Sequence, residues 1–225
     1  MATDSLININ GDSVQTLEIL FLTTMIALLP SMLVMMTSFS RYIISLSFLR
    51  TAMGTQQTPP NLVLVGMALI LTLFTMAPVI DDVTRDAYEP YRDGNITQEE
   101  FFDRAQDPLK RLMLRNTELQ SLELFFNMSG VAGPASEEEM EQSIELPIRV
   151  IVPAFVTSEL KEAFWIGFLL YIPFMLIDVI VSSTLMSMGM IMLPPSMIST
   201  PFKILLFILL DGWQLLFSTL IRTVS

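Results

Sequence analysis

The feature that most limits the fold of this chain is Leu62–Ile80, a run of 19 residues without a charged side chain. Eleven of these residues are Leu, Ile, Val or Phe. Each of them favours insertion into a bilayer by about 0.3–0.6 kcal/mol, so together they contribute roughly 3–7 kcal/mol. A helix of about 20 apolar residues is also long enough to cross the hydrocarbon core. The run therefore predicts a membrane-spanning helix that ends at Asp81–Asp82.

Further apolar runs place the chain in the class of all-α membrane proteins. They are Ile19–Ser40, Ala163–Ile177, Val179–Phe202, and Phe202–Ile221, the last interrupted by Lys203 and Asp211. Only 16% of all residues are charged, whereas soluble domains have about a quarter. Proline inside a helix bends it, so kinks are predicted at Pro30 and Pro173. We count four apolar segments and expect them to form kinked helical hairpins.

The composition argues against an enzyme. The chain has no histidine and no cysteine, which removes the commonest general base, thiol chemistry and the commonest transition-metal ligands. It also lacks a glycine-rich loop followed by Lys-Ser or Lys-Thr, so no nucleotide site is predicted. No cluster of Ser, Asp, Glu or Tyr indicates nucleophilic catalysis. We expect neither a cofactor nor a metal ion.

Charge is concentrated in the middle of the chain. Residues 81–162 carry 18 acidic and 8 basic side chains, while the other residues nearly balance. An acidic region of this kind argues against nucleic acid or an anionic membrane surface as its partner. Basic residues favour the cytoplasmic side. The segment with Arg41 and Arg50 is therefore predicted to face the cytoplasm, and the acidic region and both termini the outside.

The acidic region has its own helical signals. Thr97 and Glu100 have the spacing of a capping box, and apolar residues at helical spacing predict an amphipathic helix over roughly 107–128, ended by Gly130. These apolar residues are Leu109, Leu112, Met113, Leu119, Leu122 and Phe126. Thr157 or Ser158 is predicted to cap the next helix.

These patterns divide the chain into three regions. Residues 1–80 would form an N-terminal helix and a first apolar hairpin, after a polar and loose segment over 1–16. Residues 81–157 would form the acidic extramembrane region, and residues 158–225 a C-terminal apolar hairpin. The polar start shows no signal peptide.

Methionines gather in Leu185–Lys203, between two apolar segments. Met186, Met188, Met190 and Met192 occupy every second position, Gly189 lies among them, and Pro194–Pro195 prevents a continuous helix. The stretch predicts a tight reversal with a flexible apolar tip and hinges at its prolines. One interpretation of these methionines is that they only fill apolar space, as methionine commonly does in apolar chains. The other interpretation is that the methionines form a soft seal around a passing polypeptide, which requires several copies of the chain around one axis.

Three charges interrupt the C-terminal apolar segments: Asp178, Lys203 and Asp211. A lone charge in lipid costs on the order of 3 kcal/mol, so these side chains are predicted to be buried against protein or to face water. If these segments form a hairpin, we expect Asp178 and Lys203 to be poorly placed to form an ion pair within one chain. Two roles remain open: a lock between helices or subunits, and a proton or ion relay.

Long motifs resemble one known family. They are IVPAFVTSELKEAFWIGFLLYIPFMLIDVIVSSTLMSMGMIMLPP, TPFKILLFILLDGWQLL, MMTSFSRYIISLSFLRTAMGTQQTPPN and PVIDDVTRDAYEPY. With them nearly the whole chain resembles the FliP family of the bacterial flagellar type III export apparatus. The family's methionine loop corresponds to Met190, Ile191 and Met192, where Ile191 departs from the usual three methionines. Its characteristic Asp and Lys correspond to Asp178 and Lys203.

The resemblance implies a function and a set of partners. Five copies would assemble with FliQ and FliR into a helical ring, with FlhB and FlhA as neighbours and FliO assisting assembly. The ring would lie in the flagellar basal body at the bacterial inner membrane, with periplasmic exposure, and pass unfolded flagellar proteins. The family's precursors carry a cleaved signal peptide. The alternatives are a subunit of a virulence injectisome, or an ion-coupled transporter that uses Asp178.

Overall fold

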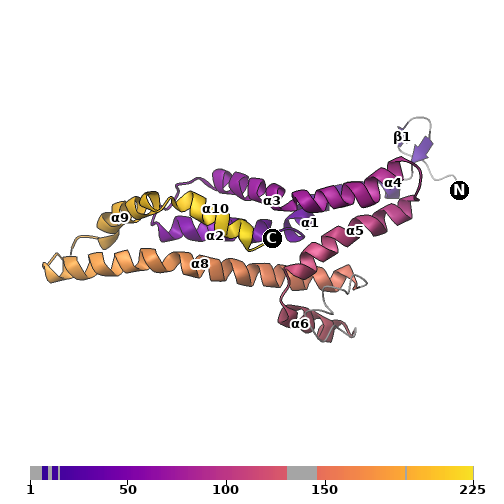
Figure 1. The fold of residues 1–225 in the computed structure, drawn as a ribbon. Helices are drawn as coiled ribbons and strands as arrows, with labels where there is room; N and C mark the ends of the chain where they lie inside the picture. The colour runs from indigo at the N-terminus through magenta and orange to yellow at the C-terminus, as the bar shows by residue number, and fades with distance from the viewer. Residues whose placement is uncertain (1–6, 10–11, 15, 131–145, 191, 225) are drawn as a thin grey trace.

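The longest element of the described fold is α8 (Ile148–Ser187), a helix of 40 residues that packs against helices both before and after it in the chain (Figure 1). The computed structural model describes residues 7–9, 12–14, 16–130, 146–190 and 192–224. At 1.5 Å per residue α8 is about 60 Å long. α2 (Phe39–Ala52) packs against both α8 and α3 (Asn61–Val83) and so lies between them. The chain is therefore elongated and mainly helical, and the all-α class that the apolar runs predicted is confirmed.

The N-terminal part combines a short hairpin with an apolar helix. β1 (Ile7–Ile9) pairs antiparallel with β2 (Asp12–Val14), so the expectation of a loose segment over 1–16 is wrong where the structure describes it. α1 (Thr16–Met35) follows, covers most of the apolar run Ile19–Ser40 and contains Pro30.

The membrane helix α3 forms where Leu62–Ile80 predicted it, but Asp81–Asp82 do not end it. The helix continues through the π-helical turn η1 (Thr84–Tyr88) into α4 (Glu89–Arg92). Arg85 explains why, because its guanidinium bonds Asp82 at 2.7 Å and Asp86 at 2.8 Å. Acidic residues end a membrane segment without ending a helix, since water solvates them and a basic neighbour pairs with them.

Two helices of the described residues are long and apolar enough to cross a membrane, Asn61–Arg92 and Ile148–Ser187. A third candidate is the pair α9 (Pro195–Leu209) and α10 (Gly212–Arg222), which is bent by 66° at the break between them. By length and composition there are thus two or three candidate spans, against the four apolar segments that we counted.

The acidic region holds two helices where the sequence predicted one. α5 (Gln98–Arg115) begins with the predicted capping box of Thr97 and Glu100, nine residues before the predicted start at 107. α6 (Leu119–Ser129) ends at Gly130 in the left-handed conformation, as predicted. Between them Glu118 is extended, and its backbone N–H donates to the hydroxyl of Ser158 at 3.0 Å. This tertiary bond replaces the helical one.

The start of α8 corrects the predicted cap. The helix begins at Ile148, after Pro147, and runs through Thr157 and Ser158 without a break. Both hydroxyls donate to backbone carbonyl oxygens four residues earlier, those of Pro153 and Ala154. The proposed boundary between residues 157 and 158 thus falls inside one helix, which links the acidic region to the apolar hairpin.

Two clusters of buried side chains lie along α8. The first joins α8 to α2, α3 and α10, and the second joins its N-terminal part to α5 and α6. The first includes Tyr42, Leu46, Leu49, Leu64, Ala68, Ile166, Phe174 and Leu220, and the second Met113, Leu114, Leu122, Phe126, Ile151 and Phe155. Each apolar stripe therefore faces another helix of the same chain, and the remaining apolar residues face outward.

The crossing of α2 and α8 supplies a test of this packing. A Cβ atom at Gly167 would lie 2.5 Å from the ring of Phe48. We expect Gly167→Ala to destabilise the fold by about 1–3 kcal/mol, because the ring must leave its place. Thermal unfolding in detergent measures this. The matched control is Gly66→Ala in α3, where no atom lies within 4 Å of the added Cβ. That variant should gain up to about 1 kcal/mol from helix propensity, and equal losses in both variants would contradict the packing.

The methionine tip and its anchoring charges

The reversal predicted between the last two apolar segments is present at the far end of α8. The helix ends at Ser187 with Met188 as its C-cap, and Gly189 has a φ of +77°. The backbone N–H of Met190 then donates to the carbonyl oxygen of Leu185 at 3.0 Å. This closes the helix in the way that a glycine in the left-handed region permits. α9 starts at Pro195, with Pro194 as its N-cap.

The methionine side chains of this tip point outward. Met186, Met188, Met190 and Met192 are all exposed, and Met192 reaches 98%. Ile191, which the resemblance also places here, lies outside the described residues. Figure 1 shows the tip at the end of the molecule opposite α4. The described part of the tip is thus a flexible apolar surface that its own chain leaves uncovered.

Asp178 and Lys203 pair beneath the tip, so the expectation that they lie poorly for pairing within one chain is wrong. The Lys203 ammonium donates to Asp178 Oδ2 at 2.6 Å and to the carbonyl oxygen of Ala52 at 3.0 Å. The turn of the hairpin is centred near Met190, 12 residues after Asp178 and 13 before Lys203. The two charges are therefore at the same height on antiparallel helices.

The members of this pair differ in burial. The Lys203 side chain is 6% exposed and that of Asp178 is 42% exposed. Lys203 also joins three elements, since Ala52 is the last residue of α2, Asp178 lies on α8 and Lys203 on α9. A cation at the C-terminal end of a helix is favoured by the helix dipole. The ammonium thus ties α2 and both arms of the hairpin together below the tip.

Asp211 was expected to be a buried charge, but its side chain is exposed. It forms no ion pair within the described residues, and has φ 49° and ψ 46° at the break between α9 and α10. Aspartate is among the few residues that adopt this left-handed conformation readily. Its observed position is therefore that of a bend residue. The predicted hinge Pro173 lies inside α8.

A buried ion pair that the sequence did not indicate connects distant parts of the chain. Arg41 donates from Nε to Glu159 at 3.0 Å and from a terminal nitrogen to its other carboxylate oxygen at 2.5 Å. The side chains are 3% and 1% exposed. Arg41 also donates to the backbone carbonyl of Thr223, which brings α2, α8 and the end of α10 together. Two opposite charges inside apolar stretches were the only signal for it.

This pair also alters the charge argument for topology. Arg41 lies in the helix α2 and is neutralised by Glu159, so it is no exposed loop charge. Arg50 remains near the turn after α2, where it donates to Asn61 and to the carbonyl of Pro59. The predicted cytoplasmic placement of this turn therefore depends on one arginine. In the described residues no group of three or more Asp or Glu side chains is placed to hold a metal ion.

The apolar helices, the buried ion pair and the exposed tip define a helical membrane protein built around a C-terminal hairpin. The sequence profile of the FliP family matches residues 22–220. The chain belongs to the FliP family.

Named relatives cover nearly its full length. The flagellar biosynthetic protein FliP of Aquifex aeolicus is 45% identical over 213 residues, which are 95% of this chain and 87% of the relative. That of Bacillus subtilis is 46% identical over 208 residues, 92% and 91% of the two chains. That of Pectobacterium carotovorum is 47% identical over 211 residues, 94% and 78%. The chain is thus a member of a family of flagellar biosynthetic membrane proteins.

Proposed function

We propose that several copies of this chain, most simply five, form the pore of the flagellar protein export gate in the bacterial inner membrane. The pore passes unfolded flagellar proteins, and FliQ, FliR, FlhB, FlhA and FliO are its partners. The acidic region has periplasmic exposure. The observation that carries this proposal is the exposed methionine tip, held from below by Lys203. The flagellar names of the relatives support a flagellar gate over a virulence injectisome.

The chemistry of the tip suits a seal around a moving polypeptide. Thioether side chains are unbranched and polarizable, so they adapt to partners of different shape. They carry no charge that would hold a passing segment. A ring of apolar side chains also excludes water and ions when nothing passes. Met186, Met188, Met190 and Met192, with Gly189 and Ile191, would line this constriction.

The outward surface of α8 supports an assembly of copies. Residues 164–180 of this helix expose large apolar side chains. They are Phe164, Trp165, Phe168, Leu169, Ile172, Met175, Leu176, Val179 and Ile180. An exposed apolar surface of this size needs lipid or protein to cover it. One copy cannot enclose a pore, so neighbouring copies would cover part of this surface.

The test is a deletion of residues 190–192 in the assembled complex. We expect ions to leak through the closed gate, because the apolar constriction that excludes them is lost. Planar-bilayer conductance measures the leak. The control is Met128→Ser, a methionine of α6 that is also exposed but distant from the tip. A deletion complex that assembles and stays as tight as the control would contradict the seal.

A further inference from the structure

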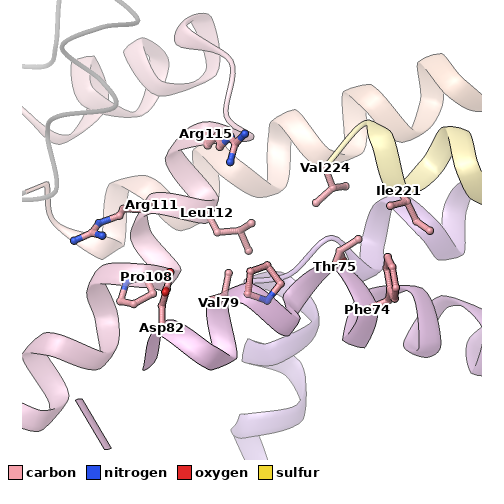
Figure 2. Close-up of a pocket in the computed structure, with 11 residues that line it drawn as sticks. Phe74, Thr75, Val79, Asp82, Pro108, Arg111, Leu112, Arg115, Ile221 and Val224 are labelled. Carbon is pink, nitrogen blue, oxygen red and sulfur yellow. The ribbon is translucent and has the colours of Figure 1, made fainter. Parts of the chain in front are cut away.

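A pocket of about 620 Å³ lies between α3, α5 and α10, away from the methionine tip (Figure 2). Its lining divides into two halves. Phe74, Ile221 and Val224 lie at one end, and Asp82, Arg111 and Arg115 at the other, as Figure 2 shows. The pocket is therefore amphipathic along its length.

The apolar half opens onto the outward surface of a candidate membrane span. Phe74 is 65% exposed, and Ile70 and Leu73 on the same helix are exposed as well. Val79 lines the pocket five residues after Phe74, close to the end of the apolar run at Ile80. An acyl chain lying along α3 can thus reach this half of the pocket from the hydrocarbon core.

The charged half begins where the apolar run of α3 ends. Arg111 and Arg115 are four residues apart on α5, hence on one face of the helix, and both are exposed. Neither forms an ion pair with the described residues. Asp82 would oppose an anion here, but its carboxylate accepts a bond from Arg85 at 2.7 Å. Two guanidinium groups therefore remain for a ligand at the level where a membrane helix meets water.

We propose that this pocket binds one anionic phospholipid, with its phosphate at Arg111 and Arg115 and an acyl chain beside Phe74 and Val79. Guanidinium groups bind phosphate through charge-assisted hydrogen bonds, and basic pockets between membrane helices suit anionic headgroups. The surrounding region carries a net negative charge. It would repel anionic lipid in general, so the binding is specific to this pocket. The proposal does not depend on the pore.

The experiment titrates the purified protein in detergent with phosphatidylglycerol or phosphatidylcholine and counts bound lipid by native mass spectrometry. We expect phosphatidylglycerol to bind more tightly. Arg111→Gln and Arg115→Gln should each weaken it about fivefold and the double variant about 25-fold, because each basic side chain near a membrane surface contributes about 1 kcal/mol. The control is Arg92→Gln, an exposed arginine paired with Asp93 and absent from the pocket lining. It should bind like the unmodified chain.

Three kinds of result would overturn the proposal. One is equal binding of both lipids, or binding that the double variant leaves unchanged. Another is that inorganic phosphate or deacylated glycerophosphoglycerol displaces bound phosphatidylglycerol as well as free phosphatidylglycerol does. In that case the apolar half of the pocket contributes nothing to binding. A third comes from a photoreactive side chain placed at Leu112, which lines the pocket. If it labels a polypeptide and no lipid in native membranes, the pocket is a protein interface. Thermal unfolding confirms that the exposed-arginine variants are folded.

Discussion

Glu159→Ala should lower the free energy of unfolding by about 3–5 kcal/mol, because it leaves the buried guanidinium of Arg41 without its partner. Part of the loss comes from geometry. Arg41 connects Glu159 on α8 with the backbone of Thr223, so its displacement also frees the end of α10. A chain of this size loses roughly 2–4 °C in unfolding midpoint per kcal/mol. The expected decrease is therefore on the order of 10 °C in detergent.

Two matched variants separate burial from charge. Glu118→Ala removes an exposed ion pair of α8, Glu118–Lys161, whose side chains are 42% and 59% exposed. An exposed pair contributes less than about 1 kcal/mol, so this variant should barely move the midpoint. The double variant Arg41→Met/Glu159→Leu removes both buried charges and should recover most of the stability. If Glu159→Ala is as mild as Glu118→Ala, the buried pair does not hold the helices together.

The second large effect concerns the charges below the methionine tip, where we expect an asymmetry. Asp178→Ala should cost about 3 kcal/mol, because the buried Lys203 ammonium keeps only the carbonyl of Ala52. Lys203→Met should cost about 1 kcal/mol, since the half-exposed Asp178 carboxylate can be solvated. Burial of the lysine thus predicts that loss of the acid is the more harmful change.

The same variants distinguish a lock from an ion relay. Chemical unfolding gives the stability of each variant, and size-exclusion chromatography shows whether complexes form. A lock predicts that Asp178→Leu/Lys203→Met restores both stability and assembly. A relay makes a different prediction for a single variant. Asp178→Asn should then assemble normally and lose only the coupling of transport to ion flow, measured in transport assays. If the double variant assembles but transports nothing, the charges take part in transport.

Local chemistry made several features predictable from the sequence. The apolar run 62–80 forms a helix that is long and apolar enough to span a bilayer, because it holds no charged residue. Thr97 and Glu100 start α5 because a capping box needs only residues three apart. Gly189 and Pro194 produce the reversal because one supplies a left-handed residue and the other stops a helix. Each of these signals lies within a few positions of its effect.

Other features could not be predicted because their causes lie far apart in the chain. Arg41 and Glu159 are separated by 118 positions, and either one alone is an ordinary helix residue. Asp178 and Lys203 meet only because the hairpin turns near Met190, and a turn placed a few residues elsewhere would separate them. The break between α5 and α6 depends on Ser158, 40 positions from Glu118.

By itself, the sequence determined the class of protein, the apolar helices and the flexible methionine tip, since hydrophobicity and turn chemistry act locally. Only the tertiary structure decided which charges are buried, which partners neutralise them, and that an amphipathic pocket forms between α3, α5 and α10. The physical reason is that charge pairing and cavities depend on the register in which distant helices cross. For Lys203 this register decided between an unpaired charge in lipid and an anchor for the tip.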